Sequence, residues 1–266
     1  MASYIDIAVN LAGSKLEHQL EQVITDAQAA NVAAFIVVGS HLPESQRVIE
    51  LCQQCPKHLF ATAGVHPHHA STWNDSSAQQ LNNMLEHNTV VALGECGLDY
   101  NRNFSTPAQQ RYAFEAQLEL ATHTQKPIYL HCRDAHQDFI KLIKQYRPQL
   151  SKAVLHCFTG NRNEMQQCLD LDLHLGITGW VCDERRGQAL AELVKDIPAN
   201  RLMLETDSPY LLPRNMTPKP KSSVNYPKYL PIIAETIAKL RNEPLEIFSA
   251  TCLNNTLAFF NLENRI

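Results

Sequence analysis

The sequence predicts a (β/α)₈ barrel of the TIM type. Short apolar runs alternate along the chain with segments in which apolar residues recur every three or four positions. The chain has 266 residues, a typical length for one such barrel. Its composition marks neither a linker nor an internal repeat, so we expect residues 1–266 to form a single domain.

Eight apolar runs are predicted as strands. They are short and often apolar at consecutive positions, as is typical of parallel strands that are buried on both faces. They lie at about 4–10, 33–39, 59–65, 90–95, 127–132, 152–157, 173–178 and 201–206.

The segments between these runs have helical spacing. Apolar residues share one helix face at Leu16, Leu20, Val23, Ile24 and Ala27. The Pro-rich stretch 209–227 predicts a long ordered loop over the mouth of the barrel, followed by helices at about 226–240 and 244–260.

Composition and charge limit the classes of function that the chain can have. Hydrophobic residues make up 44% of the chain, enough for a sizeable core, and the net charge of −4 disfavours a protein that wraps long duplex DNA. Contact with nucleic acid would therefore be local. The eight cysteines, the lack of a signal peptide and the lack of an 18-residue apolar stretch predict a cytoplasmic protein with reduced thiols and no membrane span. We expect a monomer.

Potential metal ligands follow several predicted strands at their carboxyl ends, where barrel enzymes gather their ligands. They are His66 and His68 after the third run, Glu95 and Asp99 after the fourth, His131 after the fifth, His156 after the sixth, and Glu205 and Asp207 after the eighth. Burying two imidazoles with two carboxylates is costly unless a cation joins them. We therefore predict that Glu95, His131, His156 and Asp207 hold a divalent metal. This donor set suits Mg²⁺, Mn²⁺ or Zn²⁺.

Six segments together resemble the TatD family of metal-dependent deoxyribonucleases, and the likeness covers essentially the whole chain. They are GVHPH at 64–68, GECGLDYNRNFST at 94–106, HCRDAH at 131–136, LHCFTG at 155–160, GITGWVCDERRG at 176–187 and ETDSPYLLPR at 205–214. The resemblance implies a TIM-type barrel and metal-dependent hydrolysis of phosphodiester bonds. It also implies 3′–5′ exonuclease activity on single-stranded DNA and RNA, with Mg²⁺ and a role in DNA repair or nucleic-acid degradation.

The resemblance also implies residue roles. Glu95 would hold or bridge metal, His131 and His156 would be imidazole ligands, and Asp207 would bind metal or accept the proton of the attacking water. His66 would contact the scissile phosphate, so Glu95, Asp207 and His66 are the expected catalytic residues.

The first strand departs from the family pattern. Many members carry a His-x-His pair there, whereas this chain has Ala8 and Asn10. Ala8 cannot bind a metal and Asn10 offers only an amide, which weakens a second metal position and favours Mg²⁺ over Zn²⁺.

Substrate contacts are expected from His66, Arg133 and Asn10. Other basic residues could guide a strand, and four aromatic residues could stack bases. They are Arg102, Arg185, Arg186, Arg214, Lys219 and Lys221, with Tyr100, Phe104, Trp180 and Tyr210.

Two other function classes stay open at this point. The same barrel and ligands serve small-molecule amidohydrolases and lactonases, which the acidic net charge favours. The missing His-x-His pair and the lack of a strand-end lysine disfavour them. A non-catalytic scaffold is the other alternative, and the set of strand-end ligands disfavours it.

Overall fold

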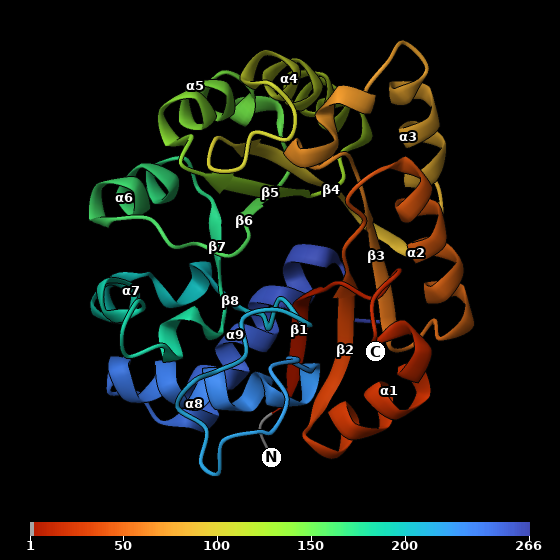
Figure 1. Cartoon of the computed structure of the whole chain (residues 1–266). Helices are drawn as coiled ribbons and strands as arrows, with labels where there is room; N and C mark the ends of the chain where they lie inside the picture. Colours follow the sequence, from red (N-terminus) through yellow and green to blue (C-terminus); the bar gives the residue numbers. More distant parts are fainter. Residues whose placement is uncertain (1–2) are drawn as a thin grey trace. The chain divides into compact units, whose positions relative to one another are not determined.

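All eight predicted strands are present in the computed structural model, which describes residues 3–266 (Figure 1). The strands follow one another in the sheet in sequence order, and helices separate them. Their bounds are β1 Tyr4–Val9, β2 Val32–Val37, β3 Leu59–Ala63, β4 Val90–Asp99, β5 Ile128–Arg133, β6 Ala153–Leu155, β7 His174–Ile177 and β8 Leu202–Leu204. The alternation of parallel strands and helices is that of a (β/α)₈ barrel.

Helices separate the strands in the described chain. Their bounds are α1 Leu20–Ala29, α2 Leu42–Gln54, α3 Ser77–Leu85, α4 Pro107–Thr124, α5 His136–Tyr146, α6 Arg162–Asp170, α7 Gln188–Leu193, α8 Leu230–Arg241 and α9 Leu245–Phe260. Helices α1, α8 and α9 lie over the helical segments predicted at 16–27, 226–240 and 244–260. The start of helix α4 is set by a capping box and a proline. Thr106 accepts a hydrogen bond from the Gln109 amide, the Gln109 side chain bonds back, and Pro107 fills the first position.

The described chain divides into two compact units. The first contains the described residues up to Ile36 together with Cys157–Met165 and His174–Ile266. The second contains Val37–His156 and Gln166–Leu173. A single domain over 1–266 stays a prediction.

Strands β3 to β6 pair side by side in the second unit. Strand β4 extends to Asp99, four residues beyond its predicted end, and all its residues are buried. Its pairing with β5 shifts register between Leu93 and Cys96. A register shift of this kind, a β-bulge or a similar irregularity, re-aims the side chains beside it. The rings of Phe114 and Phe139, from α4 and α5, stack at 5.8 Å in the core.

In the first unit, β7 pairs with β8, and a bridge between Val9 and Ser208 joins the end of β1 to the segment after β8. Asp6 of β1 is fully buried and accepts hydrogen bonds from the Thr206 amide at 2.9 Å and from the Thr206 hydroxyl. Burial raises the pKa of Asp6 from 3.8 to about 8 despite these bonds. Asp6 thus ties β1 to the residue that precedes Asp207.

Residues 209–226, which follow β8, form turns and bends without a regular helix or strand, as the proline content predicts. In the part of the chain that the structure describes, each helix is too short or too polar to span a bilayer.

The buried Asp6 carboxyl should make stability depend on pH. Its folded pKa of about 8 exceeds its unfolded value near 3.8, so its contribution is complete below about pH 4 and is lost as the pH rises through about 8. The wild type should therefore lose stability relative to Asp6→Asn across this range, by a few kcal/mol in order of magnitude. Urea unfolding at several pH values measures the difference. Asp75→Asn, at an exposed loop position, is the control; a wild-type advantage over Asp6→Asn that does not change with pH would contradict the assignment.

Candidate active site

The site starts from a close approach of two strand backbones in the second unit. Gly94 and Gly97 have φ angles of +135° and +148°, which side-chain-bearing residues rarely adopt. A Cβ at Gly94 would lie 2.1 Å from the Tyr129 carbonyl oxygen, and one at Gly97 would lie 1.9 Å from that of His131. Glycine at these two positions of the GECGLD segment therefore lets β4 lie against β5, with Glu95 where the register of the two strands shifts.

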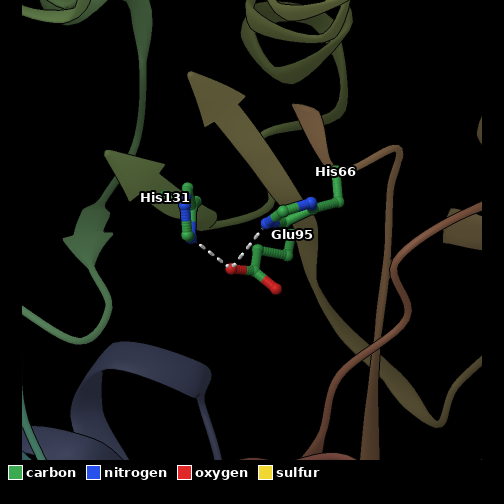
Figure 2. A group of neighbouring side chains, drawn as sticks. All are labelled: His66, Glu95 and His131. Carbon is green, nitrogen blue, oxygen red and sulfur yellow. Dashed lines mark hydrogen bonds and ion pairs between the residues drawn. The ribbon is translucent and has the colours of Figure 1, made fainter. Parts of the chain in front are cut away.

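One carboxylate oxygen of Glu95 faces three imidazoles. Its Oε1 lies 2.9 Å from Nδ1 of His131, 3.4 Å from Nε2 of His156 and 3.6 Å from Nε2 of His66. Figure 2 shows the His66 and His131 rings turned toward this carboxylate. Glu95, His66 and His156 are each less than 9% exposed.

Each imidazole comes from the carboxyl end of a different strand. His66 follows β3 and begins a short 3₁₀ helix, Pro67–Thr72. His131 lies within β5, and His156 immediately follows β6, with its ring stacked on Tyr129. Strand order thus gathers residues that are far apart in sequence, as the strand-end pattern predicts.

A second carboxylate, which the predicted ligand set omits, completes the cluster. Oδ2 of Asp99 lies 2.9 Å from Nε2 of His68 and 3.3 Å from Nε2 of His131. His131 therefore bridges Glu95 and Asp99. The sequence carries a signal for this, because Asp99 follows Glu95 by four residues on a strand and His68 follows His66 by two.

The cluster shifts the pKa values of its members in opposite directions. Burial raises the pKa of Glu95, but the nearby His66, His156 and His131 lower it more, so it lies well below its ordinary range. For His131, burial lowers the pKa, and the bonds to Asp99 and Glu95 raise it above its usual value overall. Burial holds the pKa of His66 well below 6.5. The carboxylate is therefore ionised and His66 is neutral near pH 7.

These donors fit a metal ion. Ligand atoms of His66, Glu95 and His131 lie within 4.8 Å of one another. Two ligands at roughly 2.1 Å from one ion are separated by about 3 to 4 Å. The three nitrogens lie 2.9 to 3.6 Å from Glu95 Oε1, which matches this spacing to within about 0.1 Å.

His66 uses its second ring nitrogen for a hydrogen bond to the backbone. Its Nδ1 accepts a hydrogen bond from the backbone amide of His68 at 3.1 Å. A neutral imidazole that accepts at Nδ1 carries its proton on Nε2. The nitrogen that faces Glu95 is then a donor, which suits contact with an anion better than ligation of a metal.

Three further predicted site residues are Asp207, Asn10 and Arg133. Asp207 and Asn10 lie together in the first unit, where the Asn10 side-chain amide donates to Asp207 Oδ1 at 2.9 Å. Arg133 is exposed in the second unit, two residues beyond His131 on β5. Alternate residues of a strand point to the same face, so Arg133 lies on the face of His131.

Comparison with known proteins decides the family. A family model described as "TatD related DNase" matches residues 5–261. The chain belongs to the TatD family. A TatD relative from Edwardsiella piscicida, named "3'-5' ssDNA/RNA exonuclease TatD", is 50% identical over 258 residues, which cover 97% of this chain and 99% of the relative.

Solved TatD structures share the whole fold. The TatD homologue YJJV from Escherichia coli K12 is 27% identical, with a TM-score of 0.87 over 97% of this chain and 98% of that one. A TatD family hydrolase from Entamoeba histolytica is 26% identical, with a TM-score of 0.86 over the same shares. Together with the strand order, this similarity confirms the predicted (β/α)₈ barrel.

The glycine at the β4–β5 contact can be tested against a matched glycine. Gly97→Ala should destabilise the protein by several kcal/mol and weaken metal binding, because the new methyl group meets the His131 backbone. Gly13 also has a positive φ, but a Cβ there meets no atom within 4 Å. Gly13→Ala should therefore cost only the conformational strain, about 1 to 2 kcal/mol. Urea unfolding and Mn²⁺ titration calorimetry measure both effects; equal losses in the two variants would refute the packing argument.

Proposed function

We propose that the protein is a metal-dependent 3′–5′ exonuclease that hydrolyses phosphodiester bonds in single-stranded DNA and RNA. The observation that carries the proposal is the buried Glu95 carboxylate with three imidazoles around one oxygen. The 50% identical relative that bears this activity in its name supports it.

In this proposal Glu95, His131 and His156 hold the metal, and Asp207 completes the set. A bound divalent ion supplies polarisation of the phosphoryl oxygen and lowers the pKa of a coordinated water. Mg²⁺ is the proposed ion, with Mn²⁺ or Zn²⁺ as alternatives. Asp99 supports this role of His131, because a carboxylate on the second ring nitrogen fixes the orientation of an imidazole ligand.

The chain's own residues divide the remaining tasks. Glu95 or Asp207 accepts the proton of the attacking water, and the low pKa of Glu95 keeps it ionised for metal binding. Nε2–H of His66 donates a hydrogen bond to the scissile phosphate, without bringing a positive charge, since burial keeps the ring neutral. Asn10 holds the Asp207 carboxylate through its amide, and Arg133 offers a charge to the strand.

The cellular setting is also a proposal. All eight cysteines are free thiols, which supports a reducing compartment such as the cytoplasm. We propose that the protein acts there as a monomer in DNA repair or nucleic-acid degradation.

Glu95→Gln should reduce exonuclease activity at least a thousandfold while the fold survives, because it removes the charge that attracts the metal. Chelation should cause the same loss of activity in the wild type, and added Mg²⁺ should restore the activity. Single- and double-stranded oligonucleotides labelled at either end measure rate and polarity. Glu86→Gln, at an exposed position of the same unit, is the matched control. Undiminished cleavage by purified Glu95→Gln would refute the assignment of Glu95 as a metal ligand. Turnover of lactone or amide substrates, without cleavage of oligonucleotides, would favour a small-molecule hydrolase.

Asp207→Asn and His66→Gln separate metal ligation from substrate contact. Asp207→Asn should bind Mn²⁺ at least tenfold more weakly, because it loses a carboxylate ligand. His66→Gln should bind Mn²⁺ like the wild type but cleave about a hundredfold more slowly, since its Nε2 serves the phosphate. Titration calorimetry and single-turnover cleavage give the two readouts. Wild-type Mn²⁺ affinity in Asp207→Asn would remove Asp207 from the ligand set.

A further inference from the structure

The loops that follow β7 and β8 line an open pocket in the first unit. Its volume is about 750 Å³, and it is lined by residues of 179–186 and of 211–223. The two loops touch closely, because a Cβ at Gly179 would lie 2.3 Å from the Leu211 carbonyl oxygen. Both loops leave the carboxyl ends of their strands, where barrels of this type bind ligands and often phosphate groups.

The pocket is basic although the whole chain is acidic. Five cationic side chains line it, Arg185, Arg186, Arg214, Lys219 and Lys221, against the two carboxylates of Asp183 and Glu184. Formal charges therefore sum to +3 there, whereas the chain carries −4. Such a local excess of positive charge attracts anionic ligands.

A buried carboxylate holds the arginines of this pocket in place. Asp183 is 3% exposed and accepts from the backbone amides of Arg185 at 3.0 Å and Arg186 at 3.3 Å. Its Oδ2 lies 3.0 Å from the Arg186 guanidinium and 3.1 Å from Nε of Arg214.

One carboxylate cannot use all the donors of these guanidiniums, each of which has five N–H groups. The side chains of Arg186 and Arg214 stay 52% and 54% exposed. Asp183 therefore orders the arginines and leaves donors for a ligand. Ordered donors bind at a smaller entropic cost than free side chains.

An aromatic ring lies beside these charges. Trp180 lines the pocket, and the guanidinium carbon of Arg186 lies 4.5 Å from the centre of its ring. An indole and a guanidinium plane both stack with unpaired bases. Lys219 and Lys221, on the facing loop, have no hydrogen-bond or ion-pair partner within the described chain.

We propose that this pocket is a binding subsite for single-stranded nucleic acid, in which a base stacks on Trp180 and backbone phosphates contact Arg214, Lys219 and Lys221. The inference rests on the proposed nuclease function and adds strand-holding residues outside the metal cluster. The combination of aromatic and cationic groups favours a single strand over a free phosphate, which uses no ring, and over a duplex, whose bases are already stacked.

Strand binding in chelator, where no cleavage occurs, tests the subsite on the full chain. A fluorescent DNA strand of about 12 nucleotides should bind Lys219→Ala/Lys221→Ala at least tenfold more weakly than the wild type. The slope of log K against log salt should become shallower by about 1.4, because each single-strand phosphate contact contributes about 0.7. Lys195→Ala/Lys239→Ala removes the same charge at exposed positions outside the pocket and should bind within twofold of the wild type.

The fluorescence of Trp180 gives a readout that does not depend on activity. The chain has two tryptophans, so Trp73→Phe leaves Trp180 alone. The strand should quench its emission, whereas millimolar inorganic phosphate should not. Quenching by phosphate alone would mean a simple anion site and would overturn the strand assignment.

Steady-state cleavage by the loaded enzyme separates this inference from the proposed function. The pocket variant should raise KM and leave kcat unchanged, because the subsite holds substrate and transition state equally. If the wild type cleaves the strand, and the pocket variant has the same KM and strand affinity as the control pair, the subsite alone would be overturned. A wild type that neither cleaves nor binds a strand would overturn both proposals.

Discussion

The candidate site depends on the contact between the backbones of β4 and β5. Two glycines allow it, and each would place a Cβ about 2 Å from a carbonyl oxygen of β5 if it were any other residue. Where the register shifts, Glu95 lies 2.9 Å from His131, and the neighbouring strands add His66 and His156. A packing constraint between main chains therefore fixes the position of the carboxylate on which the proposed metal chemistry relies. Functional geometry held by rigid strands is more precise than geometry held by loops.

The charges of the cluster explain why a cation suits it. The pKa values of Glu95 and Asp99 are both lowered. The pKa of His131, the imidazole between them, is raised. Two carboxylates among imidazoles in a largely buried place are costly without a counter-ion. A divalent ion held by these residues would offset their negative charge. The arrangement is therefore matched to a metal rather than to a self-sufficient ion-pair network.

The strand-end pattern was sufficient to predict the eight strands, the long loop after β8 and the residues around Glu95. It did not predict the extension of β4 to Asp99, because glycines ordinarily indicate a turn, and here they serve a close approach within a strand. Asp99 and His68 were among the potential strand-end ligands, but the contacts of Asp99 with His68 and His131 depend on this extension and could not be read from the sequence. The hydrogen bond at Nδ1 of His66 also lies beyond sequence reasoning, since it depends on the turn geometry of Pro67 and His68. Residue types thus indicate the chemistry, whereas hydrogen bonds assign the roles.

An acidic protein that acts on a polyanion must concentrate its positive charge. The loops after β7 and β8 do so around Asp183, and this buried acid makes the basic pocket better ordered rather than weaker. Without it, the arginines would repel one another and lose side-chain entropy on binding. A few ordered cations beside an aromatic ring hold a short length of strand with little salt dependence, whereas a broad basic surface would retain long duplexes. Local capture of this kind suits an enzyme that works from the end of a chain and must release it after each cut.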